Sequence, residues 1–270
     1  MCIRDSFISR NGELPPTGFT GPTIPAGAQR IVCMSSSYIA MLDAVGQVDR
    51  IVAVSGINYI ANPYILAHKD SIKDMGPEMN YELLLGLKPD VVLLYGIGDA
   101  QTAVTDKLKE LAIPYMYVGE YLEESPLGKA EWLVALSELT DSRDKGIDVF
   151  REIPKRYQAL KDLTASVEQR PTVMFNTPWN DSWVMPSTQS YMVQLVTDAG
   201  ADYIYKENTS NSSAPIGLET AYGLIQKADY WINVGTASTL DELKNMNPKF
   251  ADAKSVRDKT VYNNNLRITA

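Results

Sequence analysis

Short apolar runs alternate along most of this chain with segments whose apolar residues recur every three or four positions. The runs lie at 30–34, 50–54, 90–95 and 115–118 in the first half, and at 172–175, 202–205, 229–234 and 260–262 in the second. A continuous apolar run predicts a buried strand, and the intervening spacing predicts helices. The alternation therefore predicts parallel sheets covered by helices on both faces.

Between the two halves, from Ser125 to Gln169, the pattern is helical almost without a loop. Apolar residues from Ile147 to Val167 are three and four apart, which places them on one side of a helix. Residues 143–167 would extend about 37 Å as an unbroken helix, against a radius of gyration of about 13 Å for a lobe of roughly 100 residues. Pro154 lies inside this pattern and is expected to kink or break the helix.

The two halves share a correspondence. In each half a glutamate, Glu82 or Glu219, opens a predicted helix, and an aspartate, Asp90 or Asp229, begins the strand that follows. The predicted fold class is thus α/β, with two similar lobes of mostly parallel sheet joined by one long bridging helix. Ligands bind outside the carboxyl ends of strands in open α/β sheets, so two such lobes predict a ligand cleft between those ends.

The boundaries follow from these patterns. Residues 1–27, which are rich in Pro and Gly, are expected to be an irregular N-terminal segment. The N-terminal α/β lobe is expected at 28–125, the bridging helices at 126–170 and the C-terminal α/β lobe at 171–270.

Composition excludes several functions. The 270 residues carry a net charge of −8, which argues against nucleic-acid binding because that depends on Lys and Arg. No run of 18 apolar residues predicts a membrane span, and Met1–Ser6 lack the apolar core of a signal peptide. Cys33 lies in a predicted buried strand and is expected to be an inert thiol rather than half of a disulfide with Cys2.

Several segments resemble one family, the class III periplasmic binding proteins for iron–siderophore, haem and cobalamin. The segments are Arg30-Ile-Val-Cys-Met-Ser-Ser36, Asn80-Tyr-Glu-Leu-Leu-Leu-Gly-Leu-Lys-Pro-Asp-Val-Val-Leu-Leu-Tyr-Gly96, Leu127-Gly-Lys-Ala-Glu-Trp132 and the stretch from Met185 to Ile204. The resemblance covers roughly residues 28–270. It implies two lobes joined by a long helix, a ligand captured between them, and delivery to the permease of an ABC importer.

The resemblance also implies an export signal or lipid anchor before the mature domain and a helix that closes the C-terminus. Neither is evident in this chain, so we expect a fragment whose C-terminal lobe is truncated. Location in the periplasm, or lipid anchoring at the cell envelope, is implied by the resemblance alone. The protein is expected to be a monomer that contacts ABC permease subunits. Glu82 and Glu219 match the family's two surface glutamates that meet permease arginines, and they are equally typical of a helix start favoured by the dipole.

Candidate ligand-binding residues follow the predicted strands. Ser36, Ser37 and Tyr38, together with Ser35, end the first strand, where their hydroxyls can bind a ligand or Ser36 or Ser37 can cap the next helix. Tyr95 ends the third strand before Gly96-Ile-Gly98. These glycines are consistent either with a backbone that closely approaches a ligand or with a plain turn. Gln101 occupies the position at which a dinucleotide-binding motif has its third glycine, so NAD is not expected as a ligand.

Aromatic residues supply the other candidates. Trp179 and Trp183, with Asp181 between them, lie in a predicted loop, where an indole can stack on a flat ligand or pack under the bridge. Tyr59 is a further candidate of this kind, as is Tyr121. Near the end of the chain, Arg267 follows Asn263–Asn265 and can pair with a ligand carboxylate or be solvated.

The predicted loops are poor in Lys and Arg, which favours a weakly charged iron chelate, haem or a corrinoid over a strongly anionic chelate. His68 is the only histidine, so a His-rich metal site is excluded and His68 is expected to be a surface helix residue. No cofactor is expected. The rival interpretations are an α/β enzyme with an active site between the lobes and a binding protein outside transport. The sequence has no phosphate-binding loop, no Gly-x-Ser-x-Gly elbow and no evident Ser-His-Asp set, which disfavours the enzyme.

Overall fold

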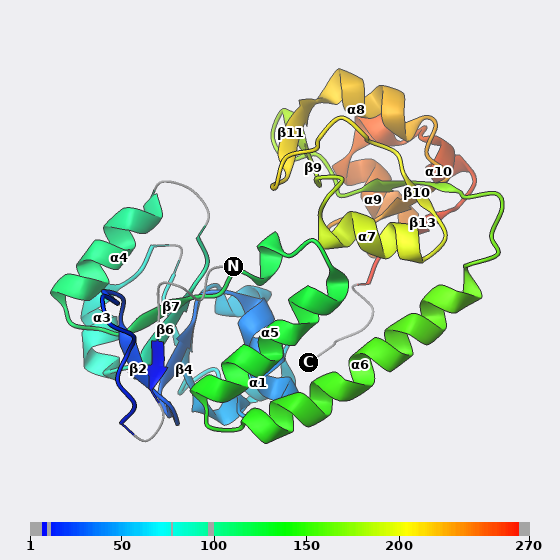
Figure 1. Ribbon diagram of the computed structural model, residues 1–270. Helices are drawn as coiled ribbons and strands as arrows, with labels where there is room; N and C mark the ends of the chain where they lie inside the picture. The colour runs from blue at the N-terminus through cyan, green and yellow to red at the C-terminus, as the bar shows by residue number, and fades with distance from the viewer. Residues whose placement is uncertain (1–6, 10–11, 77, 97–99, 265–270) are drawn as a thin grey trace. The chain divides into compact units, whose positions relative to one another are not determined.

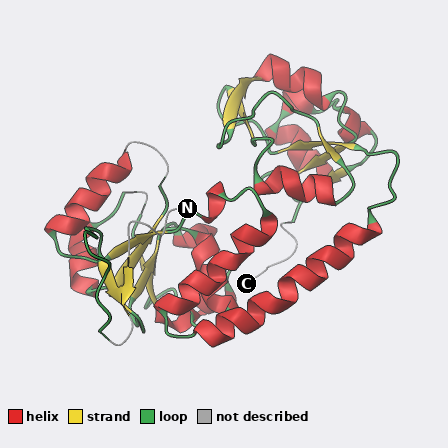
Figure 2. Cartoon of the chain, viewed as in Figure 1, coloured by secondary structure: helices red, strands yellow, loops and turns green. Residues whose placement is uncertain are grey.

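The computed structural model describes residues 7–9, 12–76, 78–96 and 100–264 (Figure 1). The chain forms two compact units. Unit 1 contains the described residues up to Glu120 together with Ala130–Ile153, and unit 2 contains Tyr121–Lys129 together with the described residues from Pro154 onward. The mixed α/β character and the mostly parallel sheets expected from the sequence are confirmed (Figure 2).

Unit 1 is built on a five-stranded parallel sheet of order β5-β4-β3-β6-β7. Its strands are β3 (Ile31–Cys33), β4 (Ile51–Val54), β5 (Lys73–Asp74), β6 (Val91–Leu94) and β7 (Tyr115–Tyr117). Alternate residues of β3 and β6 enter different cores: Ile31 packs in one, and Val32 packs in the other. The sheet is therefore covered on both faces, which explains why its strands are continuous apolar runs.

Helices α1 (Ser36–Ala44), α2 (Pro63–Ala67), α3 (Tyr81–Leu87) and α4 (Ala100–Glu110) belong to unit 1, as do the 3-10 turns Val48–Arg50 and Ile57–Tyr59. The segment 1–27 is not wholly irregular as expected, because β1 (Phe7–Ser9) pairs in parallel with β2 (Thr23–Pro25). Ile24 is fully buried in the core of unit 1. Three-residue strands next to Gly and Pro are too short for the apolar pattern to reveal.

Two consecutive helices, α5 (Pro126–Leu139) and α6 (Arg143–Leu163), occupy the region expected to be helical. Pro154 does not end α6, so the expected break is absent. The apolar spacing correctly predicted that α6 is a helix, but its apolar residues do not form a buried side. Leu160 and Leu163 are exposed, and Gly146 is the buried residue of this helix. Among the described residues, no helix combines the length and apolarity needed to cross a bilayer.

Unit 2 contains a four-stranded parallel sheet of order β10-β8-β12-β13. Its strands are β8 (Thr172–Phe175), β10 (Asp202–Tyr203), β12 (Tyr230–Ile232) and β13 (Val261–Tyr262). Helices α7 (Tyr191–Asp198), α8 (Leu218–Ile225), α9 (Leu240–Met246) and α10 (Lys254–Arg257) accompany it, with a 3-10 turn at Pro248–Phe250. Another 3-10 turn, Glu120–Leu122, begins with the last residue of the first segment of unit 1.

A separate two-stranded antiparallel sheet joins β9 (Ser182–Met185) to β11 (Ala214–Gly217). The segment around Trp183 was expected to be loop, and this expectation was wrong. Each strand depends on a partner about 30 residues away in the chain, which local patterns do not reveal.

The repeated arrangement expected from the sequence is present in the strand order. The central pair β3–β6 of unit 1 corresponds to β8–β12 of unit 2, since each pair has a parallel strand next to it on both sides, and unit 1 adds β5 beyond β4. The aspartates that precede β6 and β12 also act alike. Asp90 Oδ2 accepts hydrogen bonds from the backbone N–H groups of Gln29 and Arg30, and Asp229 Oδ2 accepts one from Thr172 N.

Candidate ligand-binding edges

The carboxyl edge of the unit 1 sheet carries a small polar network. Ser35 Oγ accepts a hydrogen bond from Ser37 N at 3.4 Å, so Ser35 caps α1, and not Ser36 or Ser37 as expected. Ser37 Oγ lies 2.9 Å from Ser35 Oγ and donates to Glu120 Oε1 at 2.7 Å. Ser36 is exposed, and its hydroxyl bonds to no described residue. Ser36 thus remains available to a ligand, whereas Ser37 is engaged within the chain.

Sequence reasoning missed Glu120. Its carboxylate is buried beside the loop that follows β3, although it comes 83 residues after Ser37. The only signal was its place directly after Gly119, two residues beyond the end of β7. A buried carboxylate needs hydrogen-bond donors, and Ser37 supplies one.

Tyr38 requires a correction. The side chain is 0 % exposed, and its hydroxyl lies 3.2 Å from Leu94 O and 3.1 Å from Val118 O. It therefore ties together the ends of β6 and β7 within the core and does not present a group to a ligand. Tyr95, one residue beyond β6, is partly buried against the same core.

Tyr59 is the most open aromatic candidate, with 93 % of its surface exposed. The turn before it is well fixed: Gly56 has a φ of 69°, and Asp74 accepts hydrogen bonds from Gly56 N and Ile57 N. The ring of Tyr59 therefore stands on an anchored turn next to the carboxyl end of β4. Tyr121 is half-buried.

Two asparagines organise the corresponding edge of unit 2. Asn176 follows β8 and Asn233 follows β12, with φ values of 67° and 58° in the left-handed region that asparagine tolerates. Asn233 Nδ2 donates to Asn176 Oδ1 at 2.7 Å, and Asn176 Nδ2 donates to Val184 O at 2.9 Å. Trp231 Nε1 donates to Asn176 O at 2.6 Å. Asn176 therefore fixes the turn that begins after β8, a role that the sequence did not indicate.

That turn separates the two tryptophans. Trp179 is 75 % exposed and pairs through its backbone with Ser182, closing a tight turn around Asn180. Asp181 is exposed beside it. Trp183 is 0 % exposed, donates to Phe175 O at 2.7 Å and packs on Trp231 and Phe250. Trp183 is thus a core residue and not a ligand contact, whereas Trp179 presents its indole to solvent.

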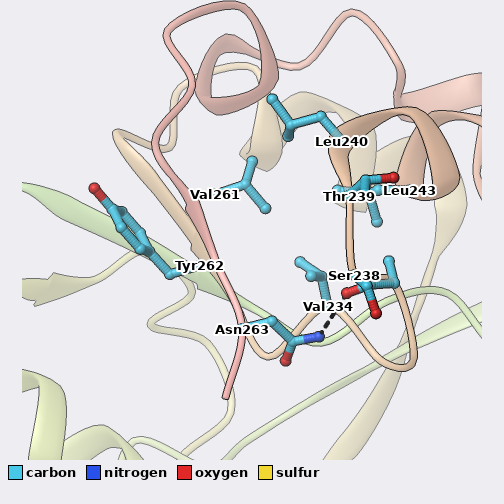
Figure 3. Close-up of a pocket in the computed structure, with 9 residues that line it drawn as sticks. Val234, Ser238, Thr239, Leu240, Leu243, Val261, Tyr262 and Asn263 are labelled. Atoms are coloured by element: carbon cyan, nitrogen blue, oxygen red, sulfur yellow. Dashed lines mark hydrogen bonds between the residues drawn. The ribbon is translucent and has the colours of Figure 1, made fainter. Parts of the chain in front are cut away.

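Asn263 has a structural role. Its Nδ2 donates to Gly235 O at 2.8 Å and to Ala237 O at 3.1 Å, which joins the loop after β12 to the end of β13. It borders a pocket of about 260 Å³ that is also lined by the apolar Val234, Leu243 and Val261 and the polar Ser238 and Thr239 (Figure 3). Arg267, Asn265 and Gly98 lie outside the described residues.

Positive charge is scarce at both edges. Residues 55–62, 95–96 and 118–120 of the loops at the unit 1 edge contain no Lys or Arg, and neither do 176–181, 233–239 and 263–264 of unit 2. Lys206, after β10, is the exception among these described loops. The described residues contain no cluster of His, Cys, Asp or Glu able to bind a metal ion. His68 is exposed at the end of α2 and stacks on Tyr64, and Cys33 is a buried thiol whose pKa burial raises.

The two glutamates expected to face a permease occupy equal helical positions. Glu82 is the second residue of α3 and Glu219 the second residue of α8, and both are exposed. Neither carboxylate pairs with a residue that the structure describes.

The chain is similar in sequence to several known proteins. An uncharacterized lipoprotein of Methanocaldococcus jannaschii is 26 % identical over 247 residues, which cover 86 % of this chain and 58 % of the relative. A vitamin B12-binding protein of Yersinia pestis is 35 % identical over 97 residues, or 35 % of this chain and 33 % of the relative. The chain thus spans about half to three-fifths of the length of the longer-matching curated relatives.

Solved structures share the fold. The periplasmic vitamin B12-binding protein BtuF of Vibrio cholerae has a TM-score of 0.67 at 18 % identity, with 88 % of each chain covered. A periplasmic heme-binding protein of Pseudomonas aeruginosa has a TM-score of 0.70 at 16 % identity, covering 87 % of this chain and 84 % of that one. The sequence model of the periplasmic binding proteins matches residues 31–264. This chain therefore belongs to the periplasmic binding protein family, as its sequence motifs indicated.

Proposed function

We propose that this chain is the substrate-binding protein of an ABC importer, which captures an iron–siderophore or haem and delivers it to a permease at the cell envelope. Trp179 carries the proposal: a large indole, 75 % exposed, stands on a turn anchored by Asn176. Exposing an indole is costly unless it has a partner, and a flat macrocycle or aryl chelate offers one. The cation-poor loops fit a chelate of low negative charge.

A corrinoid is the second candidate ligand. The similarity to a vitamin B12-binding protein over 97 residues supports it. A corrinoid is also a large, weakly charged ring system, so the same edges suit it. An enzyme of the same fold is disfavoured because neither edge brings together a nucleophile, a base and an orienting group among the described residues.

The test of ligand capture is direct titration. The purified chain is titrated with haemin, cyanocobalamin and a ferric hydroxamate while tryptophan fluorescence is recorded. We expect one ligand to bind at micromolar concentration or below, and Trp179→Ala to weaken binding about tenfold, or ~1.4 kcal/mol. Trp179→Phe, which keeps an aromatic face, should retain most of the affinity, and Leu160→Ala on the exposed side of α6 should leave it unchanged. Absence of binding to all three probes would contradict the proposed ligand class.

Delivery is tested separately through the exposed glutamates. Paired opposite charges steer docking, so Glu82→Lys with Glu219→Lys should abolish stimulation of permease-coupled ATP hydrolysis while leaving ligand affinity unchanged. Undiminished stimulation by the double variant would contradict permease docking through these residues.

A further inference from the structure

The loop between β10 and β11 carries a sequence motif that neither ligand capture nor delivery explains. Asn-x-Ser/Thr, with x other than Pro, is the acceptor motif for N-linked glycans. The chain contains it three times, as Asn180-Asp-Ser182, Asn208-Thr-Ser210 and Asn211-Ser-Ser213. Such a short motif is common by chance, so the structure around each asparagine decides which of the three a glycosylating enzyme can reach.

Glycan transfer requires two groups of the motif at once. The side-chain amide of the asparagine becomes bonded to the sugar, and the hydroxyl two residues later is recognised through hydrogen bonds. Both groups must enter the active site of the enzyme together. They must therefore be exposed, free of partners within the chain, and placed on a loop that can bend toward the enzyme.

The Asn208 motif is inaccessible because it has a structural role. Asn208 is 7 % exposed, and its Nδ2 donates to Met185 O at 3.4 Å and to Ser212 O at 2.9 Å. Its Oδ1 accepts hydrogen bonds from both the backbone N–H and the hydroxyl of Ser210, so the hydroxyl of the same motif is bound as well. Asn208 thus fixes the base of the loop and offers no free amide to an enzyme.

The Asn180 motif lies on a turn that hydrogen bonds hold closed. Trp179 N donates to Ser182 O at 2.9 Å, and Ser182 N donates back to Trp179 O at 3.2 Å. The hydroxyl of Ser182 also donates to Trp179 O, at 3.3 Å, and Ser182 is the first residue of β9. Asn180 itself is exposed, but the hydroxyl needed with it is held by the turn.

The Asn211 motif meets both requirements. Asn211, Ser212 and Ser213 are all exposed, and neither the amide of Asn211 nor the hydroxyl of Ser213 bonds to a residue that the structure describes. The base of the loop is held by Asn208 and by the hydroxyl of Ser187, which donates to the carbonyl of Ser210. The exposed end of the loop can therefore carry a bulky group while its base stays in place.

We propose that Asn211 is a site of N-linked glycosylation. This inference rests on the proposed function only in requiring an exported protein, because the transferring enzymes act outside the cytoplasmic membrane. The co-substrate is an oligosaccharide linked through phosphate or pyrophosphate to a polyprenyl lipid. Nδ2 of Asn211 forms a bond to C1 of the first sugar, and the bond from C1 to the phosphate oxygen breaks. The polyprenyl phosphate or pyrophosphate leaves, and one amide proton passes to a base on the enzyme.

The test is mass spectrometry of the protein purified from the cells in which it occurs naturally. Trypsin releases the peptide Glu207–Lys227, which contains Asn208 and Asn211 but not Asn180. Electron-transfer fragmentation of this peptide assigns a modification to one asparagine. We expect a glycan on Asn211 and none on Asn180 or Asn208.

Two neighbouring serines supply a matched pair of variants for the same cells. Ser213→Ala destroys the Asn211 motif and should abolish the modification. Ser212→Ala removes an equally exposed hydroxyl but keeps the motif, so the glycan should remain. A merely structural effect of losing a serine from this loop would not distinguish the two variants.

The outcomes are distinct from those of the proposed function. An unmodified Asn211 in the natural protein, or a glycan on Asn180 or Asn208 in its place, would overturn the inference and leave ligand import standing. A glycan that persists in Ser213→Ala would also overturn it. Ligand titration and permease stimulation use the chain made without a glycan, so their failure would contradict the proposed function and not the assignment of Asn211.

Discussion

The two halves of α6 are held in different ways. In unit 1 the buried Gly146 lets α6 approach α5 so closely that an added Cβ would lie 2.6 Å from Ser137 Cβ and 3.4 Å from Val134 Cα. In unit 2 the helix is attached by polar groups at the end of α7. Asp198 accepts from Tyr157 Oη at 2.7 Å and pairs with Lys161 Nζ at 2.8 Å, and its carbonyl accepts from Thr164 Oγ1.

One helix is therefore held by close steric packing in unit 1 and by an ion pair and hydrogen bonds in unit 2. Steric fit is insensitive to pH, whereas a carboxylate loses its attachment when it is protonated. Burial would raise the pKa of Asp198, but hydrogen bonds from Lys161, Tyr157 and Gln194 outweigh this effect and hold it below its ordinary value. Burial and the Asp198 carboxylate raise the pKa of Tyr157.

The largest effect is expected at the steric contact. Gly146→Ala should destabilise unit 1 by about 2–3 kcal/mol, since the new methyl group overlaps Ser137 and the helices must separate. Hydrogen exchange of α5 and α6 amides, measured by mass spectrometry, reports the loss. Combining it with Ser137→Gly, which removes the opposing Cβ, should restore part of the protection. If the amides of Gly146→Ala alone stay fully protected from exchange, the contact between α5 and α6 accommodates the added methyl group and the prediction is wrong.

The charged contact should give a smaller effect that depends on pH. Asp198→Asn should destabilise unit 2 by about 1–2 kcal/mol at pH 7. Because the folded pKa is depressed, the contribution of Asp198 is present above its unfolded value and is lost as the pH falls below about 4. The difference between the wild type and the variant in hydrogen exchange of α7 amides should therefore shrink as the pH falls below the unfolded pKa. An unchanged difference between pH 7 and pH 3 would contradict this assignment.

The smallest effects concern the repeated aspartates. Asp90→Ala and Asp229→Ala should each cost about 1 kcal/mol, because each removes an acceptor from backbone N–H groups at the start of the neighbouring strand. The bond from Thr172 N depresses the pKa of Asp229, and Lys254 lies 3.1 Å from its Oδ1. The destabilisation caused by Asp229→Ala should consequently begin to decrease as the pH falls below about 4, the unfolded pKa of aspartate. The two variants can be compared by urea denaturation, with amide hydrogen exchange in β3 and β8 as the readout. Very unequal losses of unfolding free energy at pH 7 would contradict the correspondence between the two aspartates.

Much of the fold was predictable because its signals are local. The apolar runs around Val32 and Val92 identify strands buried on both faces, and the order of Glu82 and Asp90 in the first half is repeated by Glu219 and Asp229 in the second. These features arise from the chain's own sequence neighbours, so a single sequence contains them.

The site was less predictable because it depends on distant partners. Trp179 and Trp183 lay in one predicted loop, and only the pairing of β9 with β11 determines that Trp183 faces the core. Glu120 became a neighbour of Ser37 through the strand order, and Asn176 became the anchor of its turn through Trp231 and Asn233. No local pattern carries those contacts.

The burial of Cys33 has a practical consequence. Its thiol is shielded within β3, and the raised pKa leaves little reactive thiolate at neutral pH. With Cys2 replaced by serine, a maleimide dye should label only cysteines introduced at chosen surface positions. One dye on each unit would then let single-molecule energy transfer report whether an added candidate ligand changes the distance between the dyes.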